Sequence, residues 1–404
     1  MIKRHVIPSI IGIPAASDAI PTSTGFTVDP ITPTPAEQKT RMNPVIASNP
    51  AANMIGITTK NNGSTSTTGT FTVTGSKVYR FRLFKDGYLA SNVVTRSFLT
   101  GSYKLPVISL ATKRDNIYNT STGLFQSGSS TKGRPGNGQD GNCNWNMDWD
   151  RPVNFDYFVP DESGQQKIAF SQEVDMSMCG GWSRAWSPHS FKLKAGKQYQ
   201  GLNSLNYQFF PGKPYLKHKT LQIRNGGNDT NCRIKDGALQ EIVNRSGLYV
   251  DGQSFQPVEV FINGTFYAVL NMREPNNKHY AYANYGLSAD DQDQFEISPD
   301  SGYVQMTGTK EAFDRWYELS ARAADPAAYE EIRTLVDVDE FINYIAIELY
   351  LGNWDWPKNN LKAFRPRTGN GRFRFVTFDL DGAFSIGDPF TSFEEKRIFT
   401  FDML

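Results

Sequence analysis

The sequence predicts an α+β fold with a sheet-rich first half, a crossing point near residue 274 and a helical second half that carries an acidic β-hairpin. Three observations predict this class. Short strands separated by Gly and Asn turns fill the first half, helical periodicity dominates residues 309 to 351, and acidic residues stand at both ends of a hairpin between residues 353 and 383. A chain of 404 residues is long enough for two or three domains. We expect domain boundaries near residues 45 and 100.

The composition excludes several classes of partner and site. With 42 basic and 41 acidic residues, the net charge of +1 gives no electrostatic case for a nucleic acid or an anionic membrane. No apolar run approaches the length of a spanning helix, so no membrane span is expected. Cys143, Cys179 and Cys232 are too few for a disulfide framework, although one pair can bridge. Without a CxxC pattern and with four histidines, a zinc site is not expected.

Residues 1 to 45 are rich in Pro, Ser and Thr and show no sustained helical or strand period, which indicates a tether or a damaged strand region and not a core. Lys3 and Arg4 precede VIPSIIGIPAASDA, an apolar stretch interrupted by Pro8 and Pro14 that is similar to a weak signal peptide. A cleaved signal and a retained tether both remain open. Abundant aromatic, Asn, Gly, Ser and Thr residues favour an extracytoplasmic location.

Residues 46 to 100 predict a small antiparallel β unit with one buried face. Tyr79 and Phe81 alternate with arginines, Asp86 and Gly87 form a turn, and more apolar residues follow. The segment FKDGYLASNVVTRSF resembles the small β-sandwich modules attached to chitobiase and other secreted carbohydrate enzymes. That resemblance implies a spacer.

Residues 101 to 195 continue the sheet-rich part. LPVISLAT, residues 105 to 112, predicts a buried strand, residues 123 to 141 a mobile loop, and WNMDWDRPVNFDYFVP the start of a new sheet. Residues 174 to 195 then predict two strands joined by a glycine turn with a polar tip. Backbone N–H groups and cations in such a loop can cradle phosphates, although strand lysines also form ordinary solvated faces. The candidate residues are Gly180, Gly181, Ser183, Arg184, Lys192 and Lys194.

A strand from residue 219 to Arg224, the loop NGGNDTN and a helix from about residue 232 to 245 come next. The helix is expected to bury an apolar stripe made of Ile234, Ala238, Leu239, Ile242 and Val243. Asp236 and Glu241 lie off this stripe, and either can pair with a basic residue of a strand or remain solvated.

A hairpin turn at Asn263 and Gly264 joins the next two strands, PVEVFING and FYAVLNMRE, which lead to a hinge at residues 274 to 277. Farther on, residues 336 to 351 predict a buried helix. Asp337 is its expected N-cap, with Glu340 completing a capping box. Its expected apolar positions are residues 338, 341, 342, 345, 346 and 349.

The acidic hairpin follows this helix directly. Asp355 and Asn360 precede a strand at residues 361 to 364, and Asp379 and Asp381 follow a second strand at residues 373 to 378. Since a hairpin brings its ends together, these carboxylates and the amide are expected to gather at one edge. This order of groups matches the catalytic segment of protein kinases, in which one Asp faces the attacking hydroxyl and an Asn and a second Asp hold Mg²⁺.

From about residue 105 to its end the chain resembles the CotH kinase family, secreted or spore-coat proteins with an atypical protein-kinase fold. The matching segments are GGWSR with SFKLKA, LQIRNGGND with IKDGALQEIV, VFINGTFYAVLNMRE, YIAIELYLGNWDWPKNN and FVTFDLDGAF. The resemblance implies a two-lobe fold and the phosphorylation of Ser or Thr on protein substrates with ATP and Mg²⁺ or Mn²⁺.

The resemblance also assigns roles by position. Asp355 corresponds to the catalytic acid, Asn360, Asp379 and Asp381 to the metal-binding groups, and residues 180 to 184 to the phosphate loop. The phosphate contact remains open among Lys192, Lys194 and Arg224, and Glu241 is a candidate for the ion pair of the nucleotide site.

Two departures from the family leave a competing function open. His189 stands where relatives often carry a lysine, and the sequence ends at Leu404 where the family continues through further helices. The expected alternatives are therefore an active kinase and a catalytically inactive surface binding or adhesion module. A glycoside hydrolase, which needs two carboxylates about 5 to 10 Å apart, is the third hypothesis.

Overall fold

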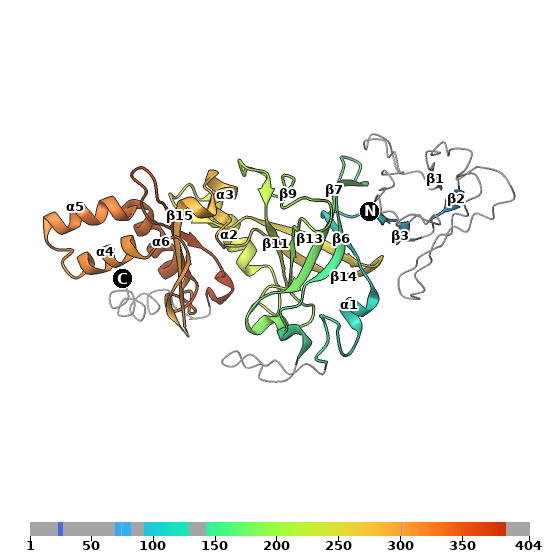
Figure 1. Cartoon of the computed structure of the whole chain (residues 1–404), viewed down its shortest axis with the longest axis horizontal. Helices are drawn as coiled ribbons and strands as arrows, with labels where there is room; N and C mark the ends of the chain where they lie inside the picture. Colours follow the sequence, from blue (N-terminus) through green and yellow to red (C-terminus); the bar gives the residue numbers. More distant parts are fainter. Residues whose placement is uncertain are drawn as a thin grey trace, which may run out of the picture. The chain divides into compact units, whose positions relative to one another are not determined.

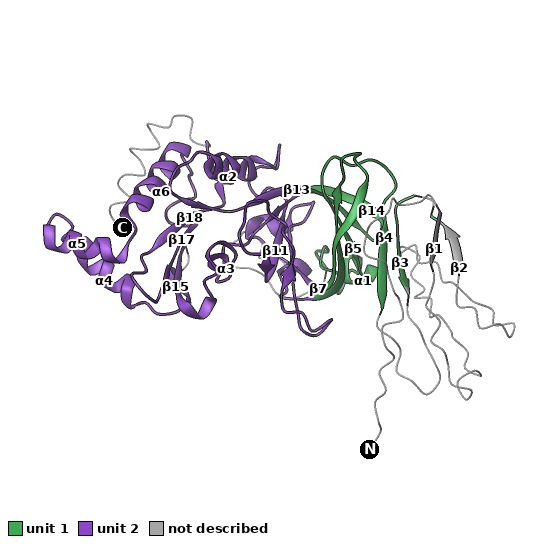
Figure 2. Ribbon diagram, turned by 90° about the horizontal axis from the view of Figure 1, so that it is seen from above, with its two compact units in different colours: residues 1–128, 151–174, 258–269 green, residues 129–150, 175–257, 270–404 purple. Residues whose placement is uncertain are grey.

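The computed structural model describes residues 75–80, 93–128, 143–299 and 301–384, together with Val73 and the backbone of strands at residues 23–26, 69–72 and 81. The predicted signal-like segment, the turn at Asp86 and Gly87 and most of the predicted loop at residues 123 to 141 lie outside these ranges. Figure 2 shows the two compact units into which the chain divides. Unit 1 holds residues 1–128, 151–174 and 258–269, and unit 2 holds residues 129–150, 175–257 and 270–404.

The described residues form several sheets and a few helices, which is consistent with the predicted α+β class, and Figure 1 follows them along the chain. The strands are β1 Ser23–Phe26, β2 Gly69–Thr72, β3 Lys77–Phe81, β4 Val94–Phe98, β5 Val107–Ala111, β6 Arg151–Pro160, β7 Gln166–Met178, β8 Phe191–Lys194, β9 Leu205–Asn206, β10 Lys217–His218, β11 Thr220–Arg224, β12 Asp251–Gly252, β13 Phe255–Ile262, β14 Thr265–Arg273, β15 Gln292–Ser298, β16 Gly302–Thr307, β17 Leu361–Pro366 and β18 Arg374–Thr377. The helices are α1 Arg114–Tyr118, α2 Lys235–Arg245, α3 Tyr280–Tyr285, α4 Glu311–Ser320, α5 Pro326–Leu335 and α6 Val338–Leu351.

Unit 1 contains the predicted antiparallel pair of β3 and β4. Tyr79 of β3 is almost fully buried, and its ring meets that of Phe98 edge to face at 5.5 Å. The strand predicted at residues 105 to 112 is β5, and every residue of it is buried. β6 pairs with β5, so the prediction that β6 begins a new sheet was wrong. Residues on both faces of β6 are buried, which removes the alternation that would have revealed its partner.

One closed barrel contains seven of these strands, in the order β11-β14-β13-β5-β6-β7-β8. Strands β7, β13 and β14 each have residues in both units. The hairpin turn predicted between β13 and β14 is confirmed, because Asn263 and Gly264 both take positive φ, 51° and 82°. Asn263 also accepts a hydrogen bond from the amide of Thr112 at 2.9 Å, which ties the turn to the end of β5.

Unit 2 contains a five-stranded sheet in the order β12-β18-β17-β15-β16. The predicted acidic hairpin is confirmed as β17 and β18, with Ala363 opposite Phe375. β15 continues the sheet beyond β17, and β12, from far earlier in the chain, adds to β18 in parallel. An aromatic core that includes Phe295, Trp316 and Phe375 fixes this sheet against the surrounding helices.

Helix α2 is where predicted but buries a different face. Ile234 and Ile242, expected in the core stripe, are 46% and 64% exposed. Its buried residues are Asp236, Gly237, Leu239, Gln240 and Val243. Since positions 236, 239, 240 and 243 share one helical face, the apolar pattern misled the prediction because two polar side chains occupy that face.

Helix α6 begins after Asp337 as predicted, but the capping box does not form. Asp337 makes no cap hydrogen bond; its carboxylate accepts one from Tyr249 at 2.8 Å and pairs with Arg372 at 3.1 Å. Glu340 instead accepts from the amide of Phe375. Ile342, expected in the apolar stripe, is 59% exposed. Val338, Phe341, Ile345 and Leu349 pack against the aromatic core as predicted. The buried residues of the helix are Glu340, Tyr344, Ile347, Glu348 and Leu351.

The cysteines and the helices bear on two expectations from the sequence. Within the described residues, no disulfide joins Cys143, Cys179 or Cys232. Among the described helices, none combines the length and the apolar character that crossing a membrane requires.

Candidate active site

The acidic turn after β18 is the centre of the candidate site, which lies wholly in unit 2. Asp379 adopts the left-handed conformation, with φ 58° and ψ 49°, and Leu380–Gly382 form a short 3₁₀ turn. A non-glycine residue in this region is uncommon and is held there by its surroundings. The conformation reverses the chain at the end of the strand, so that Asp379 and Asp381 reach the same guanidinium.

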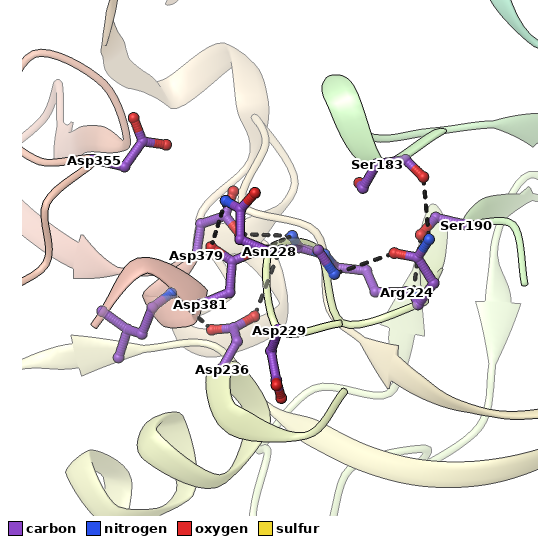
Figure 3. Close-up of polar contacts among 12 residues, drawn as sticks. Ser183, Ser190, Arg224, Asn228, Asp229, Asp236, Asp355, Asp379 and Asp381 are labelled. Carbon is purple, nitrogen blue, oxygen red and sulfur yellow. Dashed lines mark hydrogen bonds and ion pairs between the residues drawn. The ribbon is translucent and has the colours of Figure 1, made fainter. Parts of the chain in front are cut away.

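That guanidinium belongs to Arg224, the last residue of β11. Its Nη2 lies 2.6 Å from Asp379 Oδ1 and 3.7 Å from Asp381 Oδ2, and its Nη1 lies 3.4 Å from Asp236 Oδ2. Figure 3 shows these side chains converging on Arg224. Burial opposes its charge, but the carboxylates of Asp379, Asp236 and Asp381 raise the pKa of Arg224. Arg224 is therefore a permanent cation at the acidic turn.

Asp236, on the buried face of α2, links this cluster to a second strand. Arg273 of β14 donates to Asp236 Oδ2 at 2.5 Å, and the amide of Leu380 donates to Oδ1 at 3.0 Å. Although burial alone would raise it, Arg273 and Arg224 hold the pKa of Asp236 below its ordinary value. Of the two acids left open by the sequence, Asp236 is the partner of the strand cation.

Glu241, the residue chosen as the ion-pair candidate, lies elsewhere on the same helix. Its carboxylate pairs with Arg245 at 2.5 Å, an i, i+4 pair in which the two side chains are 40% and 80% exposed. The choice of Glu241 is thus corrected to Asp236. The two residues are five positions apart and project from different sides of the helix, so only one of them can face the sheet.

The loop Asn225 to Asp229 cradles Asp381. The backbone amide of Asn228 donates to Asp381 Oδ2 at 2.8 Å, and its side-chain amide donates to Oδ1 at 3.3 Å. A Cβ on Gly227 would lie only 1.8 Å from Asp381 Oδ2, so glycine leaves the room that the carboxylate fills. Burial raises the pKa of Asp381 to about 7; Asp379 adds to the rise and Arg224 opposes it.

The loop between α6 and β17 brings Asp355 and Asn360 together. Asn360 Nδ2 donates to Asp355 Oδ2 at 3.0 Å, and Asn359 Nδ2 donates to the same oxygen at 2.9 Å. Asn360 takes a positive φ of 56°, which turns the chain into β17. Because its nitrogen faces Asp355, the amide oxygen is the atom with which Asn360 can bind a cation.

The same loop packs against the acidic turn. A Cβ on Gly382 would meet Asn353 Oδ1 and Trp354 Nε1, each at 2.9 Å, and the amide of Phe384 donates to the carbonyl of Leu351 at 2.7 Å. Leu351 also belongs to an apolar cluster with Leu380 and with residues of α2. The loop of Asp355 and the turn of Asp379 are therefore in direct contact, as the hairpin predicts.

The predicted phosphate loop at Gly180 to Arg184 has a different internal arrangement from the one expected. Arg184 is buried, and it donates to the carbonyl oxygens of Gly180 at 2.8 Å and Trp145 at 3.2 Å. Its guanidinium thus holds the loop rather than facing outward, which corrects its assignment as a phosphate contact. The carbonyl of Ser183 accepts from Asn225 at 3.1 Å, so the loop is tied to the cradle of Asp381.

The strand register separates the two candidate lysines. Lys192 stands opposite Gln222, two residues before Arg224, and so shares a sheet face with Arg224. Lys194 stands opposite Thr220, two pairs farther from Arg224, and its ammonium is 3.3 Å from the Asp150 carboxylate. Arg224 contacts the acidic turn directly, Lys192 shares its sheet face, and the ammonium of Lys194 is engaged by Asp150.

The donor set suits a hard divalent cation. Asp379, Asp381 and the amide oxygen of Asn360 offer oxygen ligands, which Mg²⁺ prefers, and Mg²⁺ commonly uses one or two carboxylates with water and substrate phosphates. Within the described parts of the chain, no group of three or more His, Cys, Asp or Glu side chains is arranged to hold a metal ion. A site here therefore depends on the amide and on oxygens from outside the chain.

Three residues of this site escaped the sequence prediction: Asn228, Lys235 and Arg273. Lys235 donates to the carbonyls of Asp381 and Ala383, at 3.0 and 3.1 Å. Asn228 and Lys235 lie in the family-matching segments LQIRNGGND and IKDGALQEIV, which assigned them no role, and Arg273 ended a strand whose partner was unknown.

Comparison with known proteins agrees with the geometry. A search of curated proteins finds no match to this chain. Residues 176–400, more than half of the sequence, match the family model described as CotH kinase protein. These residues include the glycine loop, α2, the Asp355 loop and the acidic turn. The chain belongs to the CotH kinase family.

Proposed function

We propose that this chain is an atypical protein kinase that transfers the γ-phosphoryl group of ATP to Ser or Thr of a protein, with Mg²⁺ or Mn²⁺. The main support is the packing of the Asp355 loop against the acidic turn. In this arrangement Asn360 is hydrogen-bonded to Asp355, and Asp379 and Asp381 form ion pairs with Arg224. The family's two-lobe arrangement around a nucleotide is part of this proposal.

Each group has a role that its surroundings support. Asp355 accepts the proton of the acceptor hydroxyl as that oxygen bonds to phosphorus and the bond to the ADP oxygen breaks. Asn360 orients Asp355 through its nitrogen and offers its oxygen to the cation. A bound divalent cation would neutralise phosphate charge, and Asp379 and Asp381 are the carboxylates that would hold it.

Arg224 and Lys192 are the proposed phosphate contacts, with the backbone of Gly180 and Gly181 as the proposed loop around the phosphates. Arg224 already carries its charge at the acidic turn, and Lys192 lies on the same sheet face. Lys194 is a weaker candidate because it stands opposite Thr220, farther from Arg224 along the strand, and its ammonium points to Asp150.

The direct test is incorporation of labelled phosphate from ATP into a Ser-rich peptide with Mg²⁺ or Mn²⁺. Asp379→Ala is expected to lower the rate about a thousandfold or more, since a missing metal ligand costs several kcal/mol in the transition state. Asp290→Ala, at an exposed acid of the same unit, is the matched control and should retain the wild-type rate. Equal incorporation by wild type and Asp379→Ala would reject the proposal.

The competing hypothesis is an inactive surface binding or adhesion module on the same fold. Thermal unfolding with ATP and metal separates the two, because a ligand at 100 times its Kd stabilises the folded state by about 2.7 kcal/mol. A flat response together with absent phosphate transfer would favour the binding module. The proposal includes an extracytoplasmic location, which cell fractionation tests.

A further inference from the structure

The first turn of α2 grips the backbone of the acidic turn. Lys235 Nζ donates to the carbonyl oxygens of Asp381 at 3.0 Å and Ala383 at 3.1 Å, while Asp236 Oδ1 accepts from the amide of Leu380 at 3.0 Å. Two consecutive residues of one helix thus hold three backbone groups of the acidic turn, the amide of Leu380 and the carbonyls of Asp381 and Ala383. Because the Lys235 ammonium and the Asp236 carboxylate both bind backbone groups, they fix the path of the main chain in the acidic turn.

Lys235 occupies a position that helix physics disfavours. It is the first residue of α2, where the positive end of the helix dipole repels a cation. Holding a long side chain in one geometry also costs rotamer entropy. Asp229 offsets part of this cost, because its carboxylate accepts from the amides of Ile234 and Lys235 at 2.8 and 2.9 Å. Asp229 closes the loop whose Asn228 binds Asp381.

The grip also constrains the direction of the carboxylates. Asp379 is in the left-handed conformation and Asp381 lies two residues later, so a rotation of the intervening peptide would separate their side chains. Asp236 fixes the peptide unit between Asp379 and Leu380, and Lys235 fixes the one between Asp381 and Gly382. The carboxylate of Asp381 is left to Asn228 and Arg224. Backbone position and side-chain position are therefore held by different residues.

We propose that Lys235 is a positioning residue for the divalent cation: it fixes the acidic turn so that Asp379 and Asp381 present their oxygens on one edge. This inference rests on the proposed function, because it assigns the cation to these carboxylates. Lys235 itself touches neither the cation nor the substrate, and its effect is expected on metal affinity before any effect on chemistry.

The test measures Mn²⁺ binding by electron paramagnetic resonance without nucleotide, with thermal unfolding of each metal-free protein alongside. Lys235→Met is expected to weaken the Mn²⁺ Kd at least tenfold, and Lys235→Arg, which keeps a cationic donor, to restore most of the affinity. Arg245→Met removes an exposed cation from the same helix and should bind as wild type. Thermal unfolding of the metal-free variants measures how much each substitution destabilises the fold itself.

The outcomes separate the two proposals. Wild-type affinity in Lys235→Met would overturn the positioning role, as would equal weakening in Lys235→Met and Arg245→Met. No Mn²⁺ binding by wild type without nucleotide would overturn this inference, whereas the proposed function is decided separately by the transfer of labelled phosphate. If Lys235→Met fails to fold, Lys235→Gln, which keeps one amide donor, is judged by the same tenfold criterion.

Discussion

Replacing Gly227 by Ala tests the cradle of Asp381 directly. Gly227 has φ +57°, and a Cβ there would lie 1.8 Å from Asp381 Oδ2 and 3.2 Å from Arg224 Nη2. Real Cβ atoms essentially never approach a heavy atom closer than 3.0 Å, so the carboxylate must move away. It would leave its hydrogen bond with the Asn228 amide at 2.8 Å and turn from Arg224.

The expected cost has two parts. A left-handed φ disfavours alanine by roughly 1 to 2 kcal/mol. Losing hydrogen bonds to a charged, buried group adds about 1.5 to 3 kcal/mol. Gly227→Ala should therefore lower the free energy of unfolding by about 3 to 5 kcal/mol, and it should abolish metal-dependent phosphate transfer because Asp381 no longer holds its place.

The chain offers a matched control for the backbone part. Gly302 has φ +59° and a Cβ there would meet nothing within 4 Å, so Gly302→Ala carries the conformational cost without the collision. Urea unfolding of both variants isolates the contact as the difference between their free energies of unfolding. If the two variants lose the same stability and Gly227→Ala keeps its activity, the cradle does not hold Asp381 as described.

The remaining predictions concern other parts of unit 2. Burial raises the pKa of Glu340 to about 8 from an ordinary 4.5, so between these pH values the folded state keeps a proton that the unfolded state loses. The free energy of unfolding should therefore fall by about 3 to 5 kcal/mol as pH rises from 4.5 to 8. Urea titrations of Glu340→Gln should show a flatter dependence of this free energy on pH. Leu239→Ala on the buried face of α2 should cost about 2 to 3 kcal/mol, whereas Ile242→Ala on its exposed face should stay within about 0.5 kcal/mol; equal losses in thermal unfolding would refute the helix orientation. Asp355→Asn should lower kcat at least about a hundredfold while Mn²⁺ binding stays at the wild-type level, and a parallel loss of both would assign Asp355 to the metal.

Local patterns predicted the elements that carry the site. The turn at residues 368 to 371 and the flanking apolar runs specify the hairpin of β17 and β18, because turn chemistry and strand period act over a few residues. The hairpin then places Asp379 beside the loop of Asp355. The family's order of motifs pointed to the same residues, and the match over residues 176–400 agrees.

Long-range pairings were the part that the sequence did not reveal. The apolar pattern of α2 pointed to Ile234 and Ile242, while the structure buries Asp236 because two arginines from separate strands meet it there. A buried charge is stable only with partners, and those partners are fixed by the sheet register rather than by neighbours in sequence. Arg184 was also misassigned because of a long-range contact: one of the carbonyls that accept its hydrogen bonds belongs to a residue 39 positions away.

The ion cluster also has a consequence for folding order. Arg224 and Asp379 are 155 positions apart, so until the end of the hairpin is made, Arg224 and Arg273 share only Asp236 as an acidic partner in the cluster. Contacts between such distant segments form late and reward folding only when both are present. The start of α2 and residues 379 to 383 should then open and close as a single cooperative unit, with hydrogen exchange of their amides reporting one common free energy of opening.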